Sequence, residues 1–117
     1  MALAEKLQRA AQKGADQAIG VFATCDPRID AASRKRAQNI VAMAAEVIAG
    51  GVRLPDGSRP RVVYSDLLVD GESQADKVAR AFKAAGVSII VCAPDTWAFP
   101  QLGLISLLSH FPADTPL

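Results

Sequence analysis

Side chains that could bind a ligand follow three apolar runs of the chain. The runs are AIGVFA, RVVYS and VSIIVCA, at residues 18–23, 61–65 and 87–93. The polar and aromatic residues that come soon after them are Asp26, Arg28, Asp30, Asp66, Asp70, Asp95, Thr96, Trp97 and Phe99. If the runs are parallel strands, their carboxyl ends meet at one edge of the sheet, where open parallel sheets bind ligands. The sequence therefore predicts a binding site at this edge.

Arg28 is the first candidate for a ligand contact at that edge. It follows Pro27, whose fixed backbone angle stiffens the loop. A guanidinium held there presents a fork of N–H donors, which suits the hydroxyls of a polyol or a carboxylate. The competing interpretation, which the spacing alone favours, is an ion pair of Arg28 with Asp26 or Asp30 in a solvated loop.

Trp97, the only tryptophan of the chain, is the second candidate. It lies between Pro94 and Pro100 on the loop that follows the third apolar run. An indole stacks well on the apolar face of a sugar ring, and the same side chain could equally plug the sheet edge or a subunit boundary. From the residues alone, both interpretations of Trp97 stay open.

Asp26, Asp66 and Asp95 are candidates for a site that binds a hard cation. Such a site needs several carboxylates that converge at close range, and three acids on three loops do not establish this. We expect helix capping and loop solvation to account for most of them. His110 lies late in the last apolar segment, and we interpret it as a helix-end histidine, not as a metal ligand or general base.

Several motifs that carry chemistry are absent from the sequence. No GxGxxG follows the first apolar run, and neither GxxxxGK[ST] nor GxSxG occurs, so the usual phosphate-binding loops and the nucleophile elbow are missing. Cys25 and Cys92 have no CxxC spacing and cannot form a disulfide framework or a four-ligand zinc site. We expect two reduced cysteines, and we predict no catalytic residue and no metal ligand in this chain.

Helical patterns separate the apolar runs and predict how the candidate residues are positioned. Asp30 can cap a helix whose core-facing stripe is Ala37, Ile40, Val41, Ala44, Val47 and Ile48, ending at the glycines 50–51. A second helix ends before Gly86, and a third is expected over residues 101–111. This alternation predicts a doubly wound, Rossmann-like α/β fold with a parallel sheet and flanking helices.

Composition and charge narrow the class of protein. The chain has 117 residues, half of them apolar, and a net charge of +1 without a run of five like charges. Such a chain has no long-range field that would steer it to nucleic acid or anionic lipid. The sequence contains no apolar run long enough to cross a bilayer and no signal-like amino terminus, so we expect a cytoplasmic protein.

The sequence predicts an incomplete domain. Residues 1–17 are expected to form an amino-terminal helix, and residues 18–117 form the Rossmann-like domain. The last helix is apolar around nearly its whole circumference and therefore needs cover on most sides. Three strands are also fewer than the usual five or six. We therefore expect residues 18–117 to be a fragment of something longer.

Two motifs taken together resemble a known family. The first strand runs into D-P-R (Asp26–Arg28), and the next helix carries R-x-x-N (Arg36 and Asn39). A later strand runs into P-x-x-W, with Pro94 and Trp97. In this order, over about residues 18–117, the motifs resemble the amino-terminal domain of L-fucose isomerases.

The resemblance implies a manganese-dependent aldose–ketose isomerase that interconverts L-fucose with L-fuculose and D-arabinose with D-ribulose through an enediol. In that family the metal ligands lie in later domains, and the enzyme is a hexamer. The amino-terminal domain contributes an arginine and a tryptophan to the far end of the sugar in a neighbouring subunit. These positions match Arg28 and Trp97, and the 117-residue chain alone is expected to be inactive.

A second hypothesis comes from a different class of protein. The chain could be a stand-alone flavodoxin-like module without catalysis, in which the apolar last helix and Trp97 form a surface for protein docking. Only the isomerase hypothesis predicts a response to sugars.

Overall fold

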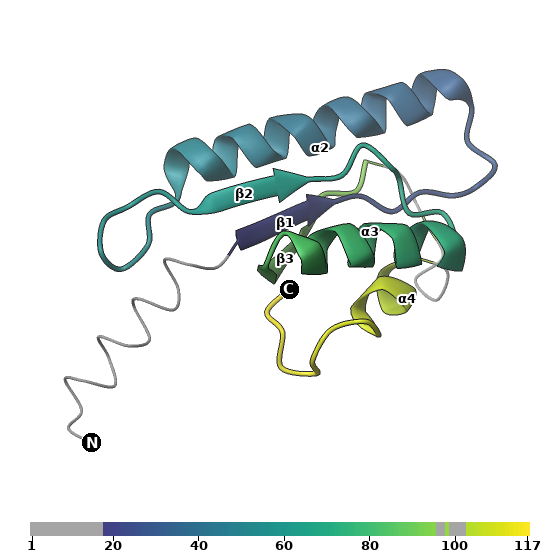
Figure 1. The fold of residues 1–117 in the computed structure, drawn as a ribbon. Coiled ribbons are helices and arrows are strands. Elements are labelled where there is room, and N and C mark those ends of the chain that lie inside the picture. The colour runs from purple at the N-terminus through teal and green to yellow at the C-terminus, as the bar shows by residue number, and fades with distance from the viewer. Residues whose placement is uncertain (1–17, 96–97, 99–102) are drawn as a thin grey trace.

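The computed structural model describes residues 18–95, 98 and 103–117, which form a parallel sheet with helices on both sides (Figure 1). In chain order the elements are β1 (Ala18–Phe22), α2 (Ala31–Gly51), β2 (Arg61–Tyr64), α3 (Glu72–Ala84), β3 (Val87–Cys92) and α4 (Leu104–Leu108). The predicted α/β fold class is confirmed, and each strand ends within about one residue of its predicted end. The helix predicted over residues 1–17 lies outside the described residues. In the described ranges, no helix combines the length and apolar composition needed to cross a membrane.

The three strands are parallel and lie in the order β2-β1-β3. All five residues of the central strand β1 are buried, as its unbroken apolar run predicts. One irregularity interrupts the pairing of β1 with β3, where Ala18 lies opposite Val87 but Ile19 lies opposite Ile89. Ser88 is therefore an extra residue that forms a bulge in β3.

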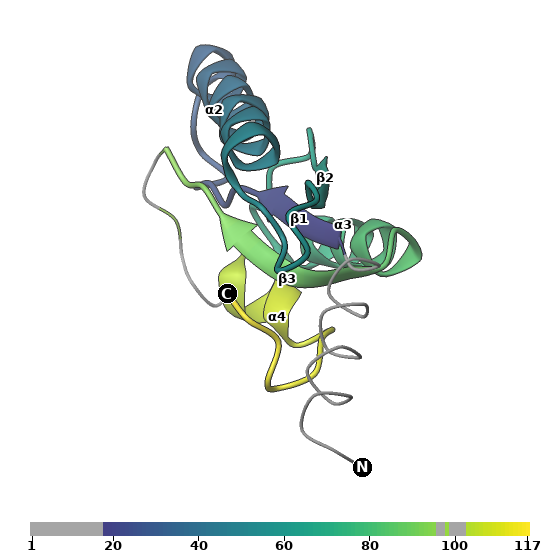
Figure 2. The ribbon, with the colours of Figure 1, turned by 90° about the vertical axis from the view of Figure 1, so that its left-hand side faces the viewer.

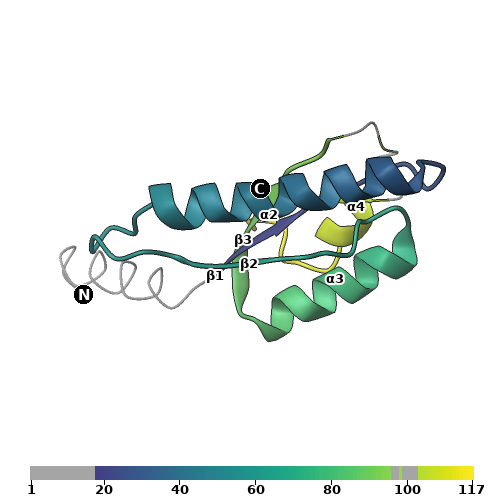
Figure 3. The ribbon, with the colours of Figure 1, turned by 90° about the horizontal axis from the view of Figure 1, so that it is seen from above.

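Two apolar clusters fill the spaces on the two faces of the sheet. Figures 1, 2 and 3 show α2 over one face and α3 with α4 over the other. The cluster on the α2 face includes Val21, Cys25, Ala37, Val41 and Leu68. The cluster on the α3 and α4 face includes Phe22, Val78, Phe82, Ile90 and Leu107. Alternate residues of β1 supply both clusters, so the strand that leads into the Asp26 loop is fixed from both sides.

Helix α2 has the predicted boundaries, but its core-facing stripe is narrower than predicted. The buried residues of the helix are Ala37, Val41 and Ala45. Val47, which we expected on the same face, is 72% exposed, and so the prediction for this residue is wrong. The reason is geometric, because two residues turn an α-helix by about 200° and place Val47 on the side opposite Ala45.

Helix α4 is shorter than the segment predicted over residues 101–111, of which residues 101–102 lie outside the described part of the chain. Leu107 is fully buried, and Leu104, Leu108 and Phe111 pack against the same cluster. Ile105 is 58% exposed. Most of the cover that this apolar helix needs is therefore supplied by α3 and the sheet.

Candidate functional site

The loops that follow β1 and β2 lie side by side where the strands end, at the right-hand end of the molecule in Figure 1. A parallel bridge joins Thr24 to Val69, and Cys25 N donates to the Val69 carbonyl at 3.1 Å. The chain after β3 joins them, because Ala93 N donates to the Phe22 carbonyl at 2.8 Å. We call this region the carboxyl edge and define it as residues 24–36, 65–71 and 93–95. The predicted convergence of the loops is confirmed for these residues.

Asp26 and Arg28 form a bidentate ion pair at the carboxyl edge. Arg28 Nε donates to Asp26 Oδ1 at 2.9 Å, and Arg28 Nη2 donates to Asp26 Oδ2 at 2.6 Å. The backbone N–H of Arg28 donates to the same Oδ1 at 2.9 Å. The hydrogen bonds from Arg28 lower the pKa of Asp26 from 3.8 to about 2. The pairing that the spacing favoured is thus present.

The two partners of this ion pair differ in exposure. The Asp26 side chain is 10% exposed, whereas that of Arg28 is 75% exposed. Buried Asp26 therefore acts as a fixed anchor that orients a guanidinium lying at the surface. The pairing and a ligand contact are compatible roles for Arg28, because the anchor sets its orientation without covering it.

Two further arginines, both on α2, pair with acids of neighbouring loops. Arg34 Nη2 donates to Asp70 Oδ2 at 3.0 Å, and this links α2 to the loop after β2. Arg36 Nε donates to Asp95 Oδ2 at 2.6 Å, and this links α2 to the chain after β3. The acids are again the less exposed partners, at 15% and 17%. Asn39, the other residue of the R-x-x-N motif, is exposed.

Asp30, Asp66 and His110, the other described candidates from the sequence, do not share one site. Asp30 caps α2, since its Oδ1 accepts from Ser33 N at 2.7 Å, and this bond lowers the pKa of Asp30. Asp66 is exposed, and its carbonyl accepts from the Gln38 side chain at 2.9 Å. His110 follows α4, with its Nε2 3.9 Å from a carboxylate oxygen of Asp76 on α3. The expected capping and helix-end positions are confirmed for Asp30 and His110.

Trp97 lies outside the described residues, as do Thr96 and Phe99. Its stacking on a sugar therefore stays a prediction. Asp95, two residues before Trp97, is described, and its bond to Arg36 anchors the start of the loop to α2.

The donor set of the described residues does not fit a metal centre. Among these residues, no group of three or more His, Cys, Asp or Glu side chains is placed to hold a metal ion. Asp26 and Asp95, two of the three candidate ligands, hold arginines instead. Cys25 and Cys92 are free thiols, and burial raises the pKa of each, so neither is an activated nucleophile.

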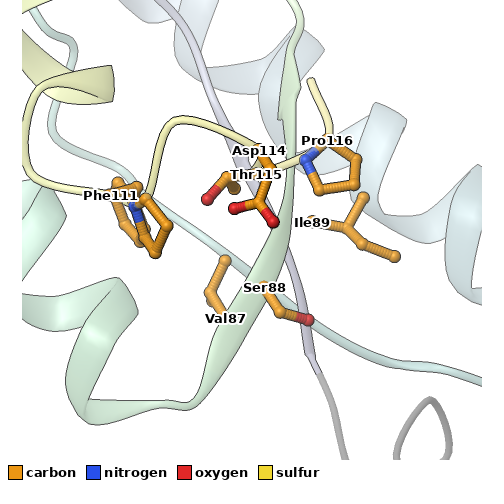
Figure 4. Close-up of a pocket in the computed structure, with 8 residues that line it drawn as sticks. Val87, Ser88, Ile89, Phe111, Asp114, Thr115 and Pro116 are labelled. Atoms are coloured by element: carbon orange, nitrogen blue, oxygen red, sulfur yellow. The ribbon is translucent and has the colours of Figure 1, made fainter. Parts of the chain in front are cut away.

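A shallow cavity of about 390 Å³ lies beside β3, between the strand and the carboxyl-terminal residues 111–116 (Figure 4). Its lining is mainly apolar, with Ser88, Asp114 and Thr115 as polar members. Figure 4 shows the Ser88 hydroxyl directed away from the Asp114 carboxylate. The cavity is lined by the first residues of β3, at the amino-terminal end of that strand, so it is separate from the carboxyl edge.

The sequence patterns did not reveal Arg34 as a residue of the site and did not indicate a partner for Arg36. One signal points to both: residues 34–36 read RKR, directly after the predicted cap of a helix. The positive end of the helix dipole disfavours basic side chains there, and the first turn of α2 has no acidic residue. Basic residues at such a position indicate acidic partners on neighbouring loops.

Comparisons with known proteins identify the family. Residues 16–117 match the family model described as L-fucose isomerase, first N-terminal domain. No curated protein matches the chain, and no solved structure matches it. The match covers most of the chain, including all of the described residues. This chain therefore belongs to the family of L-fucose isomerase first N-terminal domains.

Proposed function

We propose that this domain recognises the sugar in an aldose–ketose isomerase that interconverts L-fucose with L-fuculose and D-arabinose with D-ribulose. The observation that carries the proposal is Arg28, a guanidinium oriented by buried Asp26 and 75% exposed at the carboxyl edge. A guanidinium has five N–H donors, of which Asp26 accepts two, so the same oriented side chain can also donate to a polyol hydroxyl in a fixed geometry. In this proposal Arg28 donates to the far end of the sugar, away from the reacting carbons.

The chemistry of the carboxyl edge supports recognition more than catalysis. Isomerisation moves one proton from C2 to C1 of the sugar and one from the C2 hydroxyl to the C1 oxygen, so it needs a base whose pKa lies near the working pH. Asp26, with a pKa of about 2, is too weak a base for this step. We therefore propose that the 117-residue chain alone does not isomerise sugars.

The metal chemistry of the family is assigned to other parts of the enzyme. Manganese would polarise the carbonyl and hydroxyl oxygens at C1 and C2 when bound. Three carboxylates of this edge, those of Asp26, Asp70 and Asp95, are engaged by arginines, and we give this domain no metal-ligating role. The proposed assembly is a homo-oligomer, a hexamer by the resemblance, in which Arg28 and Trp97 reach the sugar of a neighbouring subunit. The free thiols fit a reducing, cytoplasmic location.

The alternative of a stand-alone docking module has less support. It depends on an apolar last helix that a partner must cover, yet Leu107 is buried and Leu104 and Leu108 pack within this chain. Only Ile105 of the described α4 residues is strongly exposed.

The test replaces Arg28 in the isomerase of which this domain is part. Arg28→Gln removes the charged donors, so we expect kcat/KM for L-fucose to fall about 10- to 100-fold, mainly through KM. Trp97→Ala is expected to weaken or broaden sugar selectivity in the same assay. The matched control is Arg80→Gln, which breaks an exposed pair with Asp76 on α3. If Arg28→Gln and the control give equal kinetics, Arg28 does not contact the sugar.

A further inference from the structure

Arg34 connects three segments of the carboxyl edge. Its Nη2 donates to the Pro27 carbonyl at 3.1 Å and to Asp70 Oδ2 at 3.0 Å. Its Nη1 lies 3.9 Å from the Sγ of buried Cys25. One guanidinium on α2 thus holds the loop after β1 on one side and the loop after β2 on the other.

The place of Arg34 in α2 is not explained by helix stability. It lies one turn after the cap, where its backbone N–H donates to the Asp30 carbonyl at 3.0 Å in the first bond of the helix. A positive side chain so close to the amino end opposes the helix dipole. Its side chain is also only 34% exposed, which costs rotamer freedom. The hydrogen bonds of the guanidinium to the Pro27 carbonyl and to Asp70 offset the dipole repulsion and the loss of rotamer freedom.

The turn that carries Arg28 is held by bonds within it and by a contact from α2. Inside the turn, Ile29 N donates to the Asp26 carbonyl at 3.2 Å, and Arg28 binds the Asp26 carboxylate. These bonds close the turn on itself, and the bond of Cys25 N to the Val69 carbonyl holds the residue just before it. The bond from Arg34 to the Pro27 carbonyl adds a contact from α2 in the middle of the turn, between Asp26 and Arg28.

We propose that Arg34 is a positioning residue for Arg28: by linking the Pro27 carbonyl to Asp70, it keeps the turn in the shape in which Arg28 binds Asp26 and faces the ligand. The sugar part of this inference rests on the proposed function. The positioning part does not, because it concerns only residues of this chain.

The first test is independent of any sugar. Arg34→Lys keeps the charge but replaces the planar fork with a single ammonium, which is poorly shaped to hold both acceptors. The readout is the pKa of the Asp26 carboxyl, titrated by NMR in the 117-residue chain. Its value of about 2 is set by bonds from Arg28, and Arg34 is not among its causes. A loosened turn therefore raises this pKa toward 3.8, whereas an unchanged pKa overturns the positioning role.

Two further variants keep this test decisive. Asp70→Asn leaves Arg34 in place but removes its charged acceptor, so we expect the Asp26 pKa to rise in this variant too. Arg80→Lys makes the same exchange at an arginine on α3, bonded to Asp76 at 2.8 Å, and is expected to leave the Asp26 pKa unchanged. An equal rise in the Arg80→Lys control would mean that the effect is a general loss of stability, which contradicts the proposal.

The second test measures KM for L-fucose in the isomerase of which this domain is part. Misdirecting Arg28 is expected to raise KM about tenfold in Arg34→Lys, with a smaller change in kcat. If Arg28→Gln leaves the kinetics intact while Arg34→Lys raises the Asp26 pKa, the sugar function fails and the positioning role stands. If Arg28→Gln raises KM and Arg34→Lys changes neither readout, the function stands and the positioning role fails.

Discussion

Replacing Gly20 by alanine is expected to destabilise the domain, because the centre of β1 has no room for a methyl group. A Cβ built at this position lies 2.8 Å from two ring carbons of Phe82 on α3 and 2.9 Å from Val87 Cγ1 on β3. These distances are about 0.6 Å shorter than an ordinary van der Waals contact. Phe82 is 2% exposed, so its ring cannot move aside into solvent. The absence of a side chain at Gly20 is what lets α3 lie so close to the sheet.

The net effect follows from two opposing contributions. Forcing an extra carbon into a well-packed core costs about 1–3 kcal/mol. Alanine also restricts the unfolded chain more than glycine does, which returns about 0.4–1 kcal/mol. We therefore expect Gly20→Ala to lower the free energy of unfolding by about 1–2 kcal/mol. For a domain of this size, that corresponds to a fall in Tm of roughly 4–8 °C.

The same substitution at Gly50 is a matched control of opposite sign. Gly50 lies in the last turn of α2, where an added Cβ meets no atom within 4 Å. Helix propensity then makes Gly50→Ala stabilising by about 0.5–1 kcal/mol. Urea unfolding of both variants, followed by circular dichroism, measures the two changes. A Gly20→Ala variant as stable as the unsubstituted protein would show that α3 is not packed this closely on β1, and would refute the reasoning.

Three other predictions concern the core, the ion pair and the thiols. Leu107→Ala should lower the free energy of unfolding by about 2–5 kcal/mol, because it leaves a cavity in the cluster under α4. Ile105→Ala, on the exposed side of the helix, should change the same free energy by less than about 0.5 kcal/mol. Similar values for the two variants in urea titrations would contradict the orientation of α4. The pKa of Asp26 is lowered in the folded state, so its contribution to stability is present above about pH 4 and is lost as the pH falls toward 2. The stability difference between the unsubstituted protein and Asp26→Asn, measured by urea unfolding across this range, should therefore shrink as the pH falls; a constant difference would argue against the ion pair. Cys25 and Cys92 should react slowly with a thiol reagent at neutral pH, because burial raises the pKa of both thiols. After unfolding in urea they should react quickly. Rapid labelling of the folded protein would contradict this prediction.

The fold could be predicted largely from local patterns, because burial leaves a periodic trace in the sequence. The three apolar runs became the three strands. Residues 54–60 read LPDGSRP, and the Pro-Asp-Gly sequence in it is typical of a turn; in the structure Gly57 has a φ of +84° there. Helix α3 ends before Gly86, as predicted, and Gly86 has a φ of +76°. Val47 was misplaced because an apolar side chain on a helix does not by itself reveal which face the sheet covers.

The candidate site could be predicted only in part, because sequence distance separates its members. The pair of Asp26 and Arg28 is local, and the two-residue spacing was enough to propose it. Arg34 and its partner are 36 residues apart, and Arg36 and its partner are 59 apart, so no local pattern relates them. Parallel topology could bring the loops to one edge, but which acid meets which arginine depends on side-chain reach across that edge.

These long-range pairs change the chemical interpretation of the carboxyl edge. Considered alone, three of its acids were only candidates for a cation site. In the structure, three carboxylates with side-chain exposures of 10–17% each bind an arginine that is more exposed. Each pair is neutral, and with Asp30, Asp66 and Lys35 the edge has five acidic and four basic side chains, so it offers a phosphate little net attraction. It does offer oriented donors beside shielded acceptors, an arrangement that discriminates by hydrogen-bond geometry. An uncharged polyol is a class of ligand that such geometry can select, which agrees with the sugar proposed for the carboxyl edge.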